Sequence, residues 1–349
     1  MREGSPSFLH SPPIGVAIIG CGYMGKKRSG AIKHSGMGTL VGVFDTDLCQ
    51  ARSLAETHGA KVFESPTQVW HDNQVGIVII ATPHASLAPY AIGAIESRKH
   101  VLVEKPGATT LEEIEKIQKA LSKTPLVRCK VGYHLRFHQA AESIHKHLTS
   151  NPDDRVLWLR GAYGHGGRPG YEKQWRFQKE ISGGGEIIDQ GVHLLDLFSW
   201  WVPEPFSVIA TSRQNAFYQS TQEDNGFLIL KSQRGTHAHF HCSATQWKNL
   251  FRMEIATQNF LYIWEGLGNA NYGPEKLTVI QRNPRGGVPE QTSQEFQRNA
   301  DESFTEEWRH FYLSLFPPYP RLLSSLEESF QIFQALEAIH QNIPSSLIP

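Results

Sequence analysis

The chain has 349 residues, of which 40% are hydrophobic and 19% are charged, a composition typical of a globular protein with about two domains. Lysine plus arginine and aspartate plus glutamate number 34 each, so the formal net charge is zero and no basic block indicates a nucleic-acid partner. No apolar run approaches the length of a membrane span, which argues against a membrane protein.

Residues 1–13 are rich in serine and proline and carry no apolar signal-peptide core, so we expect a flexible tail there. The cysteines are scattered and show no CxxC spacing: Cys21, Cys49, Cys129 and Cys242. Isolated cysteines of this kind are typical of reduced thiols in the cytosol. We therefore expect a cytoplasmic protein.

Apolar runs alternate with helical patterns between residues 14 and 133. The runs cover 14–20, 39–45, 75–82, 100–106 and 126–133. The helical patterns cover 47–59, 87–99 and 110–123. Near-continuous apolar strands that alternate with helices indicate a parallel sheet covered on both faces, so we assign residues 14–133 to an α/β domain.

The pattern changes after about His134, where longer strand-type segments dominate. These segments cover 156–163, 206–213, 225–246, 253–265 and 276–281, and helical stretches follow near 302–315 and 323–341. Turn signals between the strands indicate a mostly antiparallel sheet. We assign 134–320 to a second α/β domain that binds substrate, and 321–349 to a C-terminal helix and tail.

The motif "GCGYMG" places Gly20, Gly22 and Gly25 in a GxGxxG pattern directly after the first strand and before a helix. In a dinucleotide-binding βαβ unit, the first glycine permits a tight turn and the second lets the backbone approach a pyrophosphate. The third lets helix and strand pack closely. We expect Tyr23 and Met24, inside the motif, to lie against the cofactor as well. A glycine-rich turn in an unrelated α/β protein is the alternative.

Asp45 ends the second strand, 20 residues after Gly25. A carboxylate there binds the adenine ribose diol and repels a 2′-phosphate, so we expect NAD rather than NADP. Lys26, Lys27 and Arg28 could soften this preference, although we expect them on the solvated face of the helix.

Two further motifs follow the ends of buried strands. "ATPH" places Thr82 and Pro83 after the third strand, and "EKP" places Glu104 and Lys105 after the fourth. Ligands bind at the carboxyl ends of strands in such sheets, so we expect these residues at the cofactor. A surface lysine at a turn is the alternative for Lys105.

The segment "GGGEIIDQGVHLLD" combines three glycines with an apolar helix that carries Asp189, His193 and Asp196. These residues lie four and seven positions apart, so on one helix they form a single polar stripe. Buried polar groups need partners. The stripe either faces a ligand or forms a structural His–Asp pair with a neighbouring element.

Taken together, these motifs resemble the glucose–fructose oxidoreductase, inositol dehydrogenase and rhizopine-catabolism family (Gfo/Idh/MocA). The resemblance runs from Gly15 to about Gln341. It implies a Rossmann dinucleotide-binding domain followed by an α/β domain with a large open, mostly antiparallel sheet. It also implies an NAD-dependent dehydrogenase that oxidises or reduces a sugar, sugar nucleotide or inositol.

The resemblance assigns roles to three residues. Lys105 matches the lysine that bonds the reacting hydroxyl and the nicotinamide ribose. Asp189 and His193 match the acid and the histidine that face the nicotinamide, the histidine being the usual proton-transfer residue. This assignment suits the chemistry, because an imidazole can take the proton of an alcohol while an ammonium stabilises the alkoxide.

This sequence departs from the family pattern at several places. His84 and Leu87 stand where many members carry asparagine and histidine, which leaves the role of that loop open. In "GYHLRF", His134 and Arg136 are candidate substrate-binding residues, and His134 could instead pack behind the site.

The stretch "GHGGRPGYEKQWRF" is a candidate mobile loop before the triple glycine. Trp175 could stack on a sugar or base, and Arg168 and Arg176 could bind a phosphate or carboxylate. An ordinary glycine-rich connection with an anchoring tryptophan is the alternative.

Alternating histidines at His237, His239 and His241 could hold zinc, but no carboxylate or cysteine completes a site, so we expect no metal and place them on a sheet face. Two other functions stay open: an NAD-binding regulator without catalysis, and an NAD-dependent glycosidase of the same fold. The open sheet suggests a homodimer or homotetramer.

Overall fold

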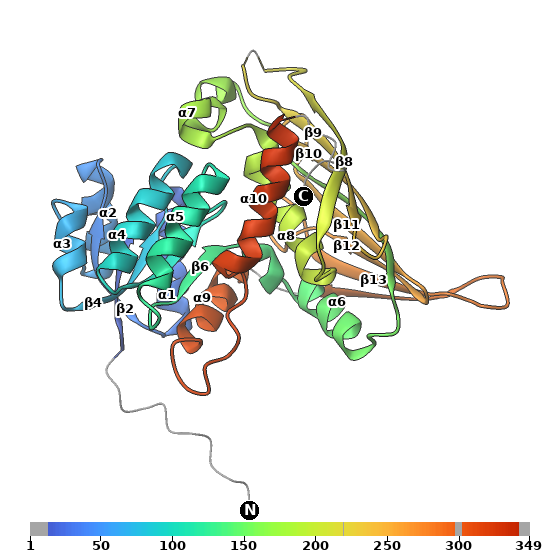
Figure 1. The fold of residues 1–349 in the computed structure, drawn as a ribbon, viewed down its shortest axis with the longest axis horizontal. Helices are drawn as coiled ribbons and strands as arrows, with labels where there is room; N and C mark the ends of the chain where they lie inside the picture. The colour runs from blue at the N-terminus through green and yellow to red at the C-terminus, as the bar shows by residue number, and fades with distance from the viewer. Residues whose placement is uncertain (1–12, 219, 297–301, 342–349) are drawn as a thin grey trace, which may run out of the picture.

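The computed structural model describes residues 13–218, 220–296 and 302–341 (Figure 1). A parallel sheet with helices forms one half, and a larger sheet flanked by helices forms the other (Figure 1). The prediction of a Rossmann domain plus an α/β domain with a large, mostly antiparallel sheet is confirmed. The tails predicted at 1–13 and within 321–349 fall almost wholly outside the described residues.

Six parallel strands in the order β3-β2-β1-β4-β5-β6 form the first sheet. They are β1 (Gly15–Ile19), β2 (Thr39–Phe44), β3 (Lys61–Val62), β4 (Val75–Ile80), β5 (His100–Glu104) and β6 (Cys129–Gly132). Its helices are α1 (Tyr23–Ser35), α2 (Leu48–His58), α3 (Pro66–His71), α4 (Leu87–Glu96) and α5 (Leu111–Ser122). The short β3 and α3 are absent from the sequence prediction.

The apolar character of these strands follows from burial on both faces. In β1, Val16 and Ile18 belong to one hydrophobic cluster, and Ala17 and Ile19 belong to the other. Because successive side chains of a strand point to opposite faces, a strand covered by helices on both sides has no polar positions. Because the strands are parallel, their carboxyl ends all lie at the same edge of the sheet.

Eight strands in the order β14-β13-β12-β11-β7-β10-β9-β8 form the second sheet, and of its strand pairs in the described ranges only β7 and β10 are parallel. They are β7 (Val156–Gly164), β8 (Phe206–Gln214), β9 (Asn225–Ser232), β10 (His237–Ser243), β11 (Leu250–Thr257), β12 (Phe260–Glu265), β13 (Glu275–Gln281) and β14 (Glu290–Phe296). Sequence patterns missed β14 because six of its seven residues are exposed and none of those six is apolar.

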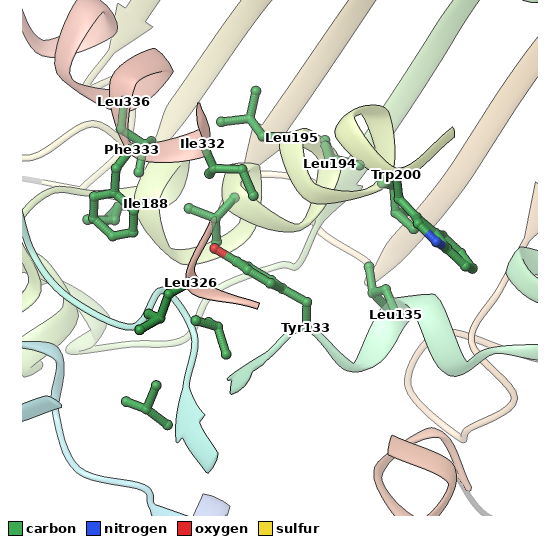
Figure 2. Close-up of a cluster of buried hydrophobic side chains, with 14 of the residues drawn as sticks. Tyr133, Leu135, Ile188, Leu194, Leu195, Trp200, Leu326, Ile332, Phe333 and Leu336 are labelled. Carbon is green, nitrogen blue, oxygen red and sulfur yellow. The ribbon is translucent and has the colours of Figure 1, made fainter. Parts of the chain in front are cut away.

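Helices cover one face of the second sheet. They are α6 (Gln139–Ser150), α8 (Val192–Trp201) and α10 (Leu326–Gln341), whereas the short α7 (Lys179–Ser182) packs beside the turn at His84–Ser86 of the first domain. Figure 2 shows Leu194 and Leu195 of α8 beside Ile332 of α10, with the ring of Tyr133 close by. This apolar contact fixes α8, and therefore the segment before it, against the rest of the molecule.

Helix α9 (Ser303–Leu313) lies within the range that we assigned to the second domain, yet it packs against α1 of the first. Its Phe304, Trp308 and Phe311 are buried in the core between α1 and the parallel sheet. The Trp308 indole donates a hydrogen bond of 2.9 Å to the carbonyl of Met37. The chain thus returns to the first domain after building the second.

The other face of the second sheet is open in this chain. Trp158 of β7 and Ile229 of β9 are about 40% exposed, and His237 and His239 lie beside them on the exposed face of β10. Among the described residues, none of the helices combines the length and the apolar character that crossing a bilayer demands.

Candidate functional site

The glycine loop after β1 has the geometry that a pyrophosphate needs. Gly20 has a φ of +94°, and a Cβ there would lie 2.5 Å from the carbonyl oxygen of Ala81. A Cβ on Gly25 would lie 2.0 Å from the Gly20 oxygen, so that position must be glycine. Gly22 caps α1 without a side chain, which leaves the first amides of the helix open to an anion.

A cavity of about 1220 Å³ runs from this loop into the space between the two domains. Nearly all residues predicted at the cofactor line it: Gly20, Gly22, Tyr23, Met24, Asp45, Thr82, Pro83, Glu104 and Lys105. Gly25 does not line it, because its role is the close packing of helix and strand. Of the predicted catalytic and substrate residues, those that line it are Asp189, His193, His134, Arg168, Trp175 and Arg176.

Asp45 lies at the end of the cavity beside the glycine loop. One carboxylate oxygen accepts the amide of Cys21 at 2.6 Å, and the other accepts the amide of Asp47 at 2.8 Å. These bonds hold the carboxylate in place where a ribose would lie. The geometry therefore suits the role that the sequence predicted for this acid.

Lys105 and Asp189 bring the two domains together at the centre of the cavity. The ammonium of Lys105 donates to the Asp189 carboxylate at 2.5 Å and to its carbonyl at 2.6 Å. Arg176 donates to the other carboxylate oxygen at 3.2 Å. Burial alone would raise the pKa of Asp189, but Lys105 and Arg176 hold that pKa well below its ordinary range. Asp189 is therefore an anion clamped between two cations.

His193 lies one helical turn beyond Asp189 and is 2% exposed. Burial, with the charge of Lys105 second, lowers the pKa of His193 well below its ordinary value, so the imidazole is neutral near pH 7. Its Nδ1 is enclosed and has no hydrogen-bond partner within the described part of the chain. A neutral imidazole that lines the cavity can accept a proton there.

The three residues of the predicted polar stripe do not all face the cavity: Asp189 and His193 line it, and Asp196 does not. Asp189 lies in a π-helical turn over Ile187–Gly191, and His193 lies in α8. A π turn is a common feature of functional sites. Asp196, further along α8, does not line the cavity, because the guanidinium of Arg136 binds it through bonds of 2.9 and 2.7 Å.

The prediction that Arg136 binds substrate is therefore not supported by its position. Arg136 is 1% exposed and bonds Glu328 of α10 at 2.5 Å in addition to Asp196. It connects α8 to α10. Asp196 therefore ties α8 to a neighbouring element, as the structural alternative expected, but it does so through an ion pair with Arg136 and not through a His–Asp pair.

The expectation that Arg28 lies on a solvated helix face is wrong. Arg28 is 1% exposed and donates to Glu104 at 2.6 Å and to Glu307 of α9 at 2.5 Å. Glu104 lines the cavity, but its carboxylate accepts the hydrogen bond from the buried Arg28. Since Glu104 precedes Lys105, the pair anchors the backbone that carries the lysine.

The loop before the triple glycine lies against the cavity. Trp175 packs edge-to-face on His84 at 4.8 Å, and Arg176 lies over the Trp175 ring at 4.5 Å. Arg168 is exposed and donates to Gln174 at 2.6 Å. Elsewhere in the cavity wall, His134 stacks on Phe304 of α9 at 4.2 Å.

Several lining residues escaped sequence reasoning. Tyr163 and His165 come from the end of β7, and Asn269 and Tyr272 come from the turn after β12. His165 lies in the loop stretch singled out above but was not itself predicted, and the other three belong to no motif, so their place near strand ends of the second domain was the available signal. Within the described ranges, no group of three His, Cys, Asp or Glu residues is arranged to hold a metal ion.

Comparison with known families gives two matches. The model of an oxidoreductase family with an NAD-binding Rossmann fold matches residues 14–133, and the model of the GFO/IDH/MocA C-terminal domain matches residues 147–259. Together they cover most of the chain.

Curated relatives include a levoglucosan dehydrogenase of Pseudarthrobacter phenanthrenivorans, 31% identical over 64% of this chain and 59% of that protein. An inositol 2-dehydrogenase of Saccharopolyspora erythraea is 26% identical over 64% of each chain. A D-glucoside 3-dehydrogenase of Escherichia coli is 28% identical over 74% of this chain and 76% of that protein. The chain thus spans about three fifths of the length of the first two relatives.

Solved structures share the fold over nearly the whole chain. A levoglucosan dehydrogenase in complex with NADH and L-sorbose has a TM-score of 0.84 and 20% identity, and the match covers 95% of this chain and 96% of that one. GenD2 from gentamicin A biosynthesis, in complex with NAD, has a TM-score of 0.79 and 20% identity over 98% and 96%.

Proposed function

Because the chain belongs to the Gfo/Idh/MocA oxidoreductase family, we propose that it is an NAD-dependent dehydrogenase that oxidises or reduces a secondary hydroxyl or ketone. The substrate is a sugar, sugar nucleotide or inositol. One observation carries the proposal: Lys105, Asp189 and His193 share a single cavity with the glycine loop and Asp45. Curated relatives named as dehydrogenases of a sugar, a glucoside and an inositol support the substrate class.

The residues at one end of the cavity suit a dinucleotide. The glycine loop and the open amides at the start of α1 would hold the pyrophosphate, and Asp45 would bind the adenine ribose. Thr82 and Pro83 would form the wall beside the nicotinamide half. When bound, NAD supplies the hydride acceptor. The Asp45 side chain would leave no room for a 2′-phosphate, which favours NAD over NADP.

Lys105 polarises the reacting oxygen. Its ammonium is fixed by two bonds to Asp189, so its remaining donor capacity points at one place in the cavity. A fixed cation stabilises the negative charge that develops on an alkoxide. Asp189 pairs with both Lys105 and Arg176, so neither cation lies in the site without an opposite charge.

His193 moves the proton. In the oxidation, the hydroxyl loses its proton to the neutral imidazole while its carbon loses the hydride. In the reduction, the same imidazole returns the proton to the oxygen. The depressed pKa of His193 keeps the imidazole neutral at neutral pH, so that one ring nitrogen is free to accept the proton.

An absorbance assay of reduced nicotinamide tests the proposal. The protein is incubated with NAD and a panel of free sugars, inositols, glycosides and sugar nucleotides, beside His193→Ala. His34→Ala, on the exposed end of α1, is the matched control. We expect one class to reduce NAD with the wild type and the control, and not with His193→Ala.

Other outcomes favour the alternative functions. Tight NAD binding, with neither reduction of NAD by any panel member nor oxidation of NADH by the corresponding keto-sugars, indicates a regulator. Cleavage of a glycoside without net NADH indicates a glycosidase. Either outcome contradicts the proposal.

Assembly and compartment belong to the same proposal. The exposed Trp158 and Ile229 on the open face of the second sheet would be covered in a homodimer or homotetramer. A monomer by light scattering at micromolar concentration contradicts this. All four cysteines are free thiols, which favours a reducing compartment such as the cytoplasm.

A further inference from the structure

His84 lies at the cavity but has no role in the mechanism above. It follows β4 as the first residue of a 3₁₀ turn over His84–Ser86 and is 3% exposed. Its Nδ1 lies 2.8 Å from the carbonyl oxygen of Ser182, 98 residues away in the second domain. The contact holds the imidazole in one orientation.

This bond determines the tautomer of the ring. A carbonyl oxygen can only accept, so Nδ1 of His84 carries the proton and donates it. In a neutral imidazole, the other nitrogen then has a free lone pair. Burial, followed by the charge of Lys105, lowers the pKa of His84 to about 4, so the ring is neutral near pH 7. Its Nε2 is therefore a hydrogen-bond acceptor.

The acceptor is open to the cavity. His84 lines the cavity, and its Nε2 makes no hydrogen bond to any of the described residues. That atom is also absent from the polar atoms that are sealed from solvent without a partner, so a ligand in the cavity can reach it. Lys105, Asp189 and Arg176 are near enough for their charges to act on the ring. Trp175 packs on its edge at 4.8 Å and limits its movement.

The surrounding groups define what can bind there. Lys105 and Arg176 can only donate hydrogen bonds, whereas Nε2 of His84 can only accept. A hydroxyl meets both demands at once, because its oxygen accepts and its proton is donated. A ketone, an ether or a fluorine cannot donate to His84.

We propose that Nε2 of His84 accepts a hydrogen bond from a second substrate hydroxyl, next to the one that reacts at Lys105 and His193. The inference rests on the proposed function and narrows its substrate class to compounds with adjacent free hydroxyls. His84 is then a specificity-determining residue. Substrates that lack the second hydroxyl leave the lone pair without a partner and are turned over poorly.

Two substitutions separate this role from the bond to Ser182. In His84→Asn, the amide nitrogen takes the place of Nδ1 and keeps the donor to Ser182, but no acceptor remains at the Nε2 position. In His84→Gln, an amide oxygen can reach the Nε2 position and restore the acceptor. Thermal denaturation checks that both variants fold.

The experiment uses the most active panel member and its monodeoxy derivatives. We expect His84→Asn to lose about ten- to a hundredfold in kcat/KM on the parent compound. One monodeoxy derivative should show the same loss with the wild type and no further loss with His84→Asn. His84→Gln should regain part of the loss. Calorimetry should give an unchanged Kd for NAD.

Each other result overturns the inference in a distinct way. Full activity of His84→Asn means that His84 only ties the domains together. A weakened Kd for NAD means that the partner hydroxyl belongs to the cofactor ribose. A wild type that turns over no panel member removes the proposed function and this inference together, whereas an active wild type with unaffected variants removes only the inference.

Discussion

Replacing Arg136 distinguishes a structural residue from a substrate-binding one. The guanidinium makes three bonds of 2.5 to 2.9 Å to Asp196 and Glu328, and Arg136 and Asp196 are each 1% exposed. Arg136→Met leaves both acids without this partner. Breaking a buried ion pair on one side costs about 3–5 kcal/mol of unfolding free energy. We expect a loss of that size, measured by urea denaturation followed by circular dichroism.

Two further variants control this measurement. Arg160→Met removes an arginine that is 62% exposed and paired with Glu254, so we expect a change within about 0.5 kcal/mol. Adding Asp196→Leu to Arg136→Met removes the stranded acid and should recover part of the stability. A stable Arg136→Met variant with a raised KM would refute the reasoning and restore the substrate-binding role.

Three other predictions concern the cofactor and the base. Asp45→Ala should raise the ratio of kcat/KM for NADP to that for NAD by about tenfold or more, and an unchanged ratio would count against the ribose role. Gly25→Ala should destabilise the protein by about 1–3 kcal/mol and weaken NAD binding by calorimetry, because its Cβ would meet a backbone oxygen at 2.0 Å. Gly30→Ala on the same helix is the control, since that Cβ meets nothing closer than 3.9 Å. Because burial and Lys105 lower the pKa of His193, kcat/KM for oxidation should stay level from about pH 8 to about pH 6, and a fall centred near pH 6.5 would contradict this.

The positions of the residues predicted at the cofactor could be inferred from the sequence because short motifs follow recognisable strands. The glycines of the loop, Asp45 and the Lys105 segment follow strands whose apolar character is visible in the chain. Since the carboxyl ends of parallel strands meet at one edge, their position in the cavity followed from topology. The link between the first domain and Asp189 came from the family resemblance and not from periodicity.

Sequence reasoning failed where the partner is distant in the chain. We predicted a ligand-binding role for Arg136 and a solvated position for Arg28. Both are buried in ion pairs with acids that lie 60 or more residues away in the chain. Helix α9 has an amphipathic pattern that says nothing about which domain its apolar face covers. Likewise, the tautomer of His84 depends on a carbonyl 98 residues away.

Transfer of deuterium tests the central claim most directly. The most active panel sugar, deuterated at its carbinol carbons, is incubated with NAD, and the reduced cofactor is examined by mass spectrometry. We predict reduced cofactor that carries a single deuterium with the wild type and with His34→Ala, and a strong loss of this product with His193→Ala and Lys105→Met. Reduced cofactor without deuterium, or equal transfer by the Lys105 and His193 variants, would contradict hydride transfer at this site.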